Sequence, residues 1–117
     1  MLNKTNRLHK AADYKKTFRF SRPTVSGRLN LRVSENRVKQ AKLVCRFGFI
    51  VSNKIDKRAS RRNGLKRRLR AIAATLLGVL KPGYDIIVMV RENYTYPYNF
   101  AEIEHDLREG LKKVGLL

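Results

Sequence analysis

The sequence predicts an α+β fold in which helices lie against a single sheet. Helical patterns, with apolar residues recurring at steps of three and four, cover residues 8–20, 60–80 and 100–114. Strand patterns cover residues 28–34, 43–52 and 84–91. The order along the chain is therefore helix, two or three strands, helix, strand and helix, or roughly αβββαβα. The length of 117 residues predicts one domain, spanning 1–117.

The N-terminal part is predicted to hold an arm and a helix. Residues 1–7 are polar, and we expect them to form a mobile arm. The helix that follows ends at Ser21, Arg22 and Pro23, because a proline disfavours the helical conformation in the residue before it. Its apolar stripe consists of Leu8, Ala11, Tyr14 and Phe18.

Two strands are predicted in the first half of the chain. In residues 28–34, leucine and valine alternate with polar residues, which indicates a strand buried on one face. Residues 35–42 are a polar connection, and residues 43–52 are rich in β-formers. The basic segment 53–59 is a loop or a short additional strand. Cys45 is the only cysteine, and its apolar neighbours predict a buried thiol in a reducing compartment.

The second half is predicted to alternate between helices and a central strand. Ser60 is expected to cap a helix that runs to about Leu80, where Lys81-Pro82-Gly83 ends it. Residues 84–91 are apolar on both faces, which is typical of a central strand. Asn99 and Glu102 then have the spacing of a capping box for the closing helix.

The charge of the chain predicts a polyanionic partner. Lysine and arginine number 27 against 9 aspartates and glutamates, so the net charge is +18. Such an excess repels itself in the folded state unless a polyanion neutralises it, and nucleic acid is the obvious candidate. The 43% of hydrophobic residues distinguishes the chain from a disordered basic tail.

The cations are concentrated in residues 57–70, and no acidic residue occurs between Asp56 and Asp85. On a helical wheel, the apolar stripe of the second helix lies opposite Asn63, Arg67 and Arg70. Arginine offers bidentate donors to phosphate, and the asparagine side chain suits a 2′-hydroxyl or a base edge. A solvated helix face normally pairs its cations with glutamate, so this face predicts contact with nucleic acid. The stripe residues are Leu65, Leu69, Ile72, Ala73, Leu76 and Leu80.

Two groups of aromatic residues have alternative interpretations. Tyr14 and Phe18 lie four residues apart on one helix face, so they are either stacking platforms for a single strand or ordinary core. Tyr94, Tyr96 and Tyr98 are predicted to lie in a surface loop, with RNA contact as the alternative.

The sequence offers no pattern for catalysis by the protein itself. The two histidines and one cysteine lack metal-ligand spacing, and no nucleophile–base–acid set is present. The acids of the closing helix are interpreted as a solvated face. We therefore expect no catalytic residue, no protein-bound metal or cofactor and no small-molecule substrate. We also expect no membrane partner and a cytoplasmic location, because no signal core or spanning segment is evident.

The segment RNGLKRRLR at 62–70 resembles the R-N-x-x-K-R-x-x-R signature of the bacterial ribonuclease P protein family. The resemblance extends to NRLHKAADYKKTF at 6–18, RFGFIVSNKIDKRASRRN at 46–63 and GYDIIVMVRE at 83–92. Tyr14 stands where the family often has phenylalanine, strand 28–34 has no aromatic residue, and 92–99 matches no family segment.

The resemblance implies an α/β sandwich on a small mixed sheet with a left-handed β-α-β crossover, like the second domain of a small-subunit ribosomal protein. It also implies that an RNA subunit removes the 5′ leader of precursor tRNA in a Mg²⁺-dependent hydrolysis. The signature helix would dock on that RNA, and a cleft between the first helix and the sheet would hold the leader. The implied RNA-subunit contacts are Lys54, Lys57, Arg58, Arg61, Arg62, Asn63, Lys66, Arg67, Arg68 and Arg70. The implied leader contacts are Tyr14, Lys15, Phe18 and Arg32.

Two other classes of function compete with this one. A ribosomal or RNA-chaperone protein would have the same composition. A membrane-active cationic protein would need bulky aromatics opposite the cations, whereas the second helix has leucine, isoleucine and alanine there.

Overall fold

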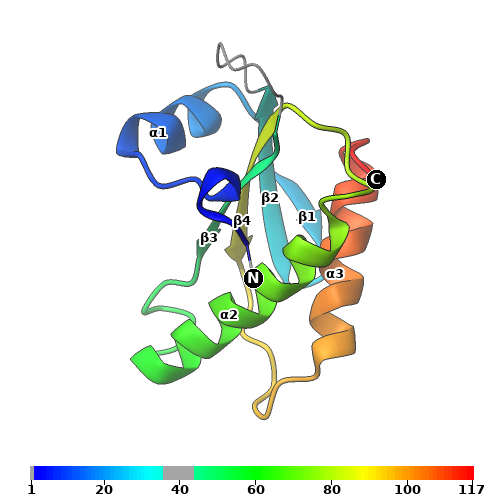
Figure 1. The fold of residues 1–117 in the computed structure, drawn as a ribbon. Coiled ribbons are helices and arrows are strands. Elements are labelled where there is room, and N and C mark those ends of the chain that lie inside the picture. Colours follow the sequence, from blue (N-terminus) through cyan, green and yellow to red (C-terminus); the bar gives the residue numbers. More distant parts are fainter. Residues whose placement is uncertain (1, 36–43) are drawn as a thin grey trace.

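The computed structural model describes residues 2–35 and 44–117 and contains a four-stranded mixed sheet with helices on both of its faces (Figure 1). The strand order is β1-β2-β4-β3, and only the β3–β4 pair is parallel. The elements are η1 (Lys4–Asn6), α1 (Ala11–Arg19), β1 (Thr24–Ser26), β2 (Leu29–Glu35), β3 (Arg46–Ile50), α2 (Ala59–Leu76), β4 (Tyr84–Val90) and α3 (Phe100–Lys113).

The parallel strands β3 and β4 are joined by α2 in a left-handed crossover. In Figure 1, β3 lies to the left of β4, both strands run downward, and α2 crosses in front of the sheet. Such crossovers are right-handed in most proteins. The unusual hand that the resemblance implied is therefore present.

The core lies between one face of the sheet and helices α2 and α3. Alternate residues of the strands point to this face because side chains alternate along a strand. They meet the apolar stripe of α2, which is buried as the helical wheel predicted, and the buried side of α3. Strand side chains in this core include Leu29, Leu31, Phe47, Ile86, Val88 and Val90.

The opposite face of the sheet carries α1 at one end, held by a partly buried ion-pair cluster. The Arg46 guanidinium makes two 2.8 Å hydrogen bonds to the Asp85 carboxylate and one of 3.2 Å to Asp13 of α1. Asp85 is 3% exposed. These hydrogen bonds raise the pKa of the Arg46 guanidinium. Nearby, the Ser34 hydroxyl of β2 donates to Thr17 of α1 over 3.3 Å.

The N-terminal segment packs on the molecule, so the expected mobile arm is wrong for residues 2–7. Leu2 is 2% exposed and belongs to the core. The Asn6 amide donates to the Cys45 carbonyl over 2.9 Å, and Arg7 pairs with Phe47 at the edge of β3. Helix α1 therefore begins at Ala11 rather than at Leu8.

The strand assignment also needs two corrections. The fourth strand is β1, at residues 24–26, and segment 53–59 contains no strand. A three-residue strand has no detectable periodicity, and β1 forms because Gly27 (φ 55°) turns it back onto β2. The predicted strand 43–52 is shorter, at 46–50, and position 43 lies outside the described residues.

Helix boundaries depart from prediction at α2 and agree at α3. Helix α2 begins at Ala59 with Arg58 as its N-cap residue, so Ser60 is not the cap, and a turn replaces its last residues before Leu80. At α3 the Asn99 side chain caps the helix by accepting from the Ala101 N–H over 3.0 Å. The predicted capping box is not completed, because the Glu102 carboxylate pairs with Arg28 instead. The Cys45 thiol is buried and donates to the Lys81 carbonyl, and burial raises its pKa.

We predict that Arg46→Ala destabilises the fold by roughly 3–5 kcal/mol, since it leaves the buried Asp85 carboxylate without its bidentate partner. Urea unfolding of the full chain would measure the loss. The matched control is Lys112→Ala, which removes an exposed pair with Glu109 at 3.5 Å and should change stability by less than about 0.5 kcal/mol. Similar losses in both variants would show that the Arg46 cluster does not anchor α1.

Candidate nucleic-acid interface

Helix α2 presents its cations on the side that does not pack on the sheet. Asn63, Arg67 and Arg70 are exposed, as the helical wheel predicted, and the helix residues Leu65 and Leu69 are 0% exposed. Arg61, Arg62, Lys66 and Arg68 are half-buried at the flanks of the stripe, and Lys54, Lys57 and Arg58 are exposed in the preceding loop. All ten predicted contact residues thus lie on one helix and the loop that leads into it.

The six cations of α2 form no ion pair with an acidic side chain among the described residues. In the described part of the chain, none of them has a carboxylate oxygen within 4.0 Å. The Arg62 and Arg68 guanidiniums instead donate to the backbone carbonyls of Asp56 and Gly64. Their positive charge is therefore not neutralised, and it is available to phosphate.

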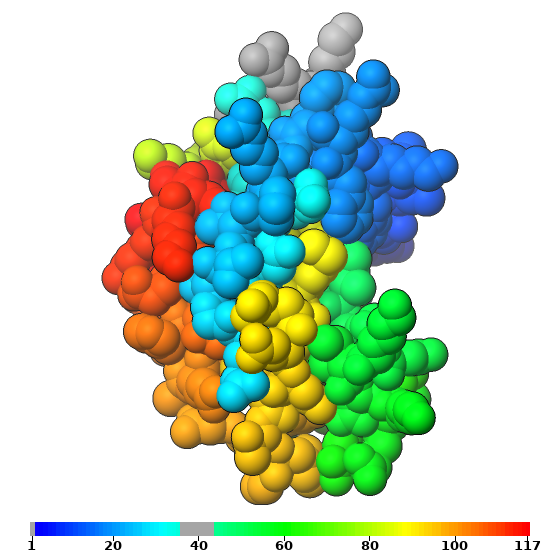
Figure 2. All heavy atoms as spheres, turned by 180° about the vertical axis from the view of Figure 1, so that it is seen from behind, coloured from blue at the N-terminus to red at the C-terminus, as the bar shows by residue number. Residues whose placement is uncertain are grey.

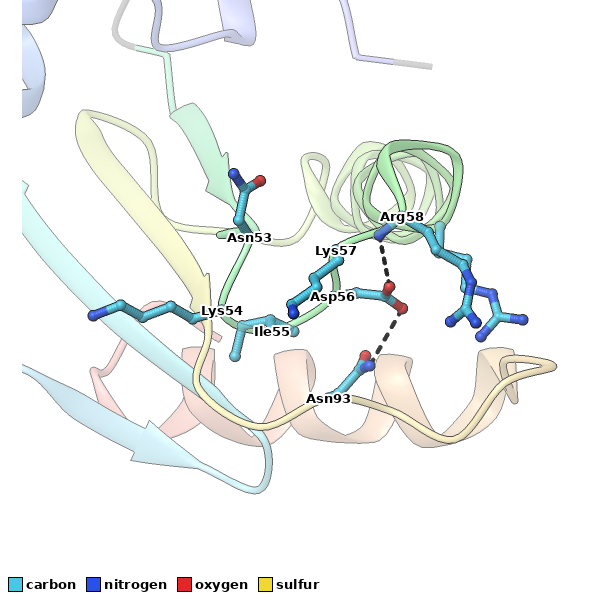
Figure 3. Close-up of a pocket in the computed structure, with 8 residues that line it drawn as sticks. Asn53, Lys54, Ile55, Asp56, Lys57, Arg58 and Asn93 are labelled. Carbon is cyan, nitrogen blue, oxygen red and sulfur yellow. Dashed lines mark hydrogen bonds between the residues drawn. The ribbon is translucent and has the colours of Figure 1, made fainter.

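The loop before α2 forms a basic pocket of about 570 Å³ with the segment after β4 (Figure 3). Asp56 organises this pocket: its carboxylate accepts the Arg58 N–H over 2.9 Å and the Asn93 amide over 3.4 Å. The pKa of the Asp56 carboxyl is lowered, mainly by the hydrogen bond from the Arg58 backbone. Desolvation by burial opposes this shift, and the hydrogen bond from Asn93 adds to it. The pocket is lined by Asn53, Lys54, Ile55, Asp56, Lys57, Arg58, Arg61 and Asn93.

Two tyrosines of the loop between β4 and α3 stack on arginines of α2. The Arg61 guanidinium lies 3.9 Å from the centroid of the Tyr96 ring, and that of Arg68 lies 5.3 Å from Tyr98. The two rings meet edge-on, with centroids 5.3 Å apart. Sequence analysis predicted a surface loop here but did not connect it to α2. The alternating tyrosines were the available signal.

Tyr94 of the same loop belongs to the core instead. It is 2% exposed, and its hydroxyl donates to the Asp106 carboxylate over 2.6 Å. Burial, followed by this hydrogen bond, strongly raises the pKa of the Tyr94 hydroxyl. Asp106 also accepts the Arg28 N–H, so the acids of α3 are not simply a solvated face. Glu102 likewise pairs with Arg28, at 3.4 Å.

On the other side of the sheet, Tyr14 of α1 rests on the backbone of β3. Its hydroxyl donates to the Leu8 carbonyl over 3.0 Å, and burial, opposed by Arg70, raises its pKa. A Cβ atom at Gly48 would lie 2.3 Å from the Tyr14 oxygen, so only glycine admits the ring this closely. Tyr14 is therefore largely a packing residue that sets the position of α1.

Phe18 and Arg32 meet where α1 overhangs the sheet. The Arg32 guanidinium lies 5.3 Å from the Phe18 ring centroid and donates to the carbonyls of Phe18 and Ser21. Both side chains are half-buried, and Lys15 is exposed on the same helix. Of the four predicted leader residues, Tyr14, Phe18 and Arg32 thus lie at the border of α1 with the sheet, whereas Lys15 is exposed on α1 and is not brought to this border.

The open sheet face beyond α1 contains Asn30, which sequence analysis missed, as well as the predicted Arg32. Figure 2 shows this side, with β2 and β4 between α1 and the start of α2. In the described residues, the buried side-chain atoms without a hydrogen-bond partner are Asn30 Oδ1 and Arg32 Nε, both on β2. Such atoms are costly to leave unpaired, and both lie below the surface of this face. The polar alternation of strand 28–34 was the signal for this face.

The cation face of α2 is the surface formed by Arg61, Arg62, Lys66, Arg67, Arg68 and Arg70. It meets the α1 side of the sheet at Arg70. This arginine and Tyr14 line one pocket of about 200 Å³, together with Phe49 of β3. A polyanion on α2 would therefore lie next to a ligand held under α1.

Comparisons with known proteins agree with this architecture. The model of the Ribonuclease P family matches residues 2–115. The ribonuclease P protein component of Cyanothece sp. is 38% identical over the whole chain and 98% of its own length. The chain belongs to the ribonuclease P protein family. The corresponding component of Pseudanabaena sp. is 34% identical over the whole chain and 97% of its length.

Solved structures of the ribonuclease P family share the fold. The protein from Staphylococcus aureus, solved as a mutant with defective mRNA degradation activity, has a TM-score of 0.83 at 23% identity, covering 97% of this chain and 92% of its own. The Thermotoga maritima protein has a TM-score of 0.74 at 24% identity, covering 92% and 96%. The relatives support the ribonuclease P interpretation rather than the ribosomal or RNA-chaperone alternative.

The described residues contain no group of three or more metal-ligating side chains. Within the same part of the chain, no helix combines the length and hydropathy needed to cross a bilayer. The apolar stripe of α2 is buried against the sheet, so this family member does not present it to a membrane surface.

We predict that Gly48→Ala destabilises the protein by roughly 1–3 kcal/mol, since the added methyl collides with the Tyr14 ring. The same substitution in a Tyr14→Ala background should cost clearly less. Chemical unfolding of the four proteins in a double-mutant cycle measures the coupling. Additive effects would show that the Tyr14–Gly48 contact does not position α1.

Proposed function

We propose that this chain docks the cation face of α2 on the RNA subunit of ribonuclease P and holds the 5′ leader of precursor tRNA beside α1. Its family is the protein component of an endoribonuclease, and its partner is the ribonuclease P RNA. In this proposal the chain assists cleavage of the leader, which yields the mature 5′ end of the tRNA. The proposal places this complex in the cytoplasm.

The observation that carries the proposal is the unneutralised charge of α2. The six cations of this helix have no carboxylate partner in the described residues, although the fold includes exposed acids elsewhere. Lining up unpaired cations costs folding free energy through repulsion, and RNA phosphates remove that cost on binding. Planar guanidiniums dominate the face, which suits bidentate contacts to phosphate.

The side chains of the protein indicate how the reaction would be divided between the protein and the RNA subunit. We propose that the RNA subunit performs the hydrolysis and that Mg²⁺ is held by RNA phosphates, because carboxylates are rare on the proposed RNA face. The protein then contributes charge screening and position. Arg70 lies where the cation face of α2 meets the α1 side of the sheet, so the leader would lie close to the RNA subunit. The protein would then reduce repulsion between the two RNAs.

We predict that Arg67→Ala and Arg70→Ala weaken binding to the RNA subunit without unfolding the chain. Both side chains are exposed, so the loss concerns phosphate contacts alone. Each variant should reduce the slope of log affinity against log salt by about 0.7–0.9 if it removes one phosphate contact. Binding measured across a salt series, with thermal melts of each variant, would test this.

Leu69→Ala is the contrasting variant for that prediction. Leu69 is 0% exposed, so its truncation should destabilise the fold by roughly 2–5 kcal/mol and leave the salt slope unchanged below the melting point. A salt-independent affinity of the wild-type chain would contradict the electrostatic basis of the proposal.

We predict that Phe18→Ala lowers the affinity of the assembled enzyme for precursor tRNA but not for mature tRNA. A lost stacking contact costs about 1–3 kcal/mol per base, and mature tRNA has no leader to report it. Binding of both tRNAs should be measured well below the melting point of the variant.

The matched control for Phe18 is Phe100→Ala, an exposed phenylalanine at the start of α3 and outside the α1 border. It should affect neither tRNA. An equal drop for both tRNAs with Phe18→Ala, or no drop for either, would show that Phe18 does not hold the leader.

A further inference from the structure

The loop between β4 and α3 contacts the cation face of α2, and its three tyrosines have different roles. Tyr94 anchors the loop through its buried hydrogen bond to Asp106. Tyr98 is half-buried, and its hydroxyl donates to the Arg61 carbonyl over 3.4 Å. Tyr96 does neither, and 54% of it is exposed. The ring of Tyr96 is therefore presented to solvent by a loop whose other two tyrosines hold it in place.

Arg61 connects this ring to the basic pocket. Its guanidinium lies 3.9 Å from the Tyr96 centroid, and the same residue lines the pocket that Lys54, Lys57 and Arg58 surround. Asp56 also lines the pocket, but its two oxygens already accept hydrogen bonds from Arg58 and Asn93 (Figure 3). An exposed aromatic ring thus adjoins a cavity whose free charges are positive.

An unpaired nucleotide matches this arrangement. A base stacks on an aromatic ring or a guanidinium through its π-face, and its phosphate is attracted by flanking lysines and arginines. A base inside a duplex has both faces occupied by its neighbours, so a duplex would use the cations but not the ring. The combination favours a single-stranded position over a helical one.

We propose that Tyr96 and Arg61 form a stacking site for an unpaired nucleotide of the RNA subunit, with its phosphate in the pocket lined by Lys54, Lys57 and Arg58. This inference rests on the proposed docking of α2 on that RNA. It adds a stacking contact to a surface otherwise explained by charge, and it assigns a role to a loop outside the signature.

The first test compares variants of the full chain for affinity to the RNA subunit alone. Tyr96→Ala should weaken binding by about 5- to 150-fold, the equivalent of 1–3 kcal/mol per stacked base, with the salt slope unchanged because no phosphate contact is lost. Tyr96→Phe keeps the ring and should restore most of the affinity. The matched control is Phe20→Ala. This ring is 65% exposed beside Arg19 at 5.3 Å, but it lies at the C-cap of α1, and its loss should leave RNA-subunit affinity unchanged.

The second test detects stacking of a base on residue 96 by fluorescence. The chain has no tryptophan, so Tyr96→Trp introduces a single indole fluorophore. The RNA subunit should quench its emission, whereas inorganic polyphosphate, which supplies phosphates without bases, should not. Val79→Trp places the fluorophore at an exposed position beyond the end of α2 and should respond to neither.

The outcomes separate this inference from the function on which it rests. If the wild-type chain binds the RNA subunit and Tyr96→Ala binds equally well, the stacking site is wrong and the proposed function stands. Quenching by polyphosphate as strong as that by RNA would also overturn it. If the wild-type chain does not bind the RNA subunit, the proposed function itself fails. Thermal melts exclude unfolding, and the fluorescence test remains decisive if Tyr96→Ala is unstable.

Discussion

The interaction on which the molecule depends is the packing of the apolar stripe of α2 against the sheet. One helix carries both this stripe and six cations, so the burial of Leu65, Leu69 and Ile72 decides where the cations point. No carboxylate oxygen of the described residues lies within 4.0 Å of these cations. The hydrophobic core therefore offsets a repulsion that the described contacts of the fold do not relieve.

A second set of contacts, on the opposite face of the sheet, gives the protein another surface. The Arg46–Asp85–Asp13 cluster and the fit of Tyr14 on Gly48 hold α1 above one end of the sheet and leave the rest of that face open. A bidentate pair held by a buried carboxylate is directional, whereas apolar burial is not. The polar cluster thus fixes the position of α1, and with it the Phe18–Arg32 contact at the edge of the open face.

The two surfaces differ in the chemistry they offer. The α2 face presents cations, and its loop adds Tyr96. The face beside α1 presents the half-buried side chains of Phe18, Asn30 and Arg32. Phosphate contacts supply affinity without much selectivity, and stacking and hydrogen bonding to single strands discriminate among RNA conformations. Because Arg70 lies between the surfaces, ligands bound on the two surfaces would lie a short distance apart.

The sequence by itself determined the α+β class, the positions of α2, β2, β4 and α3, the outward direction of Arg67 and Arg70, and the excess of positive charge on α2. These features are local: a helical or alternating period, a cap and a run of like charges can be read within about 20 residues. The tertiary structure alone decided that residues 2–7 pack on β3, that 24–26 form a strand and that Tyr94 is core while Tyr96 is exposed. It also placed Asp106 beneath the β1–β2 turn, 80 residues from Ser26, and Arg46 against Asp85, 39 residues away. These pairings join side chains far apart in the chain, and no local pattern records them, because each partner alone has the polarity of an ordinary surface residue.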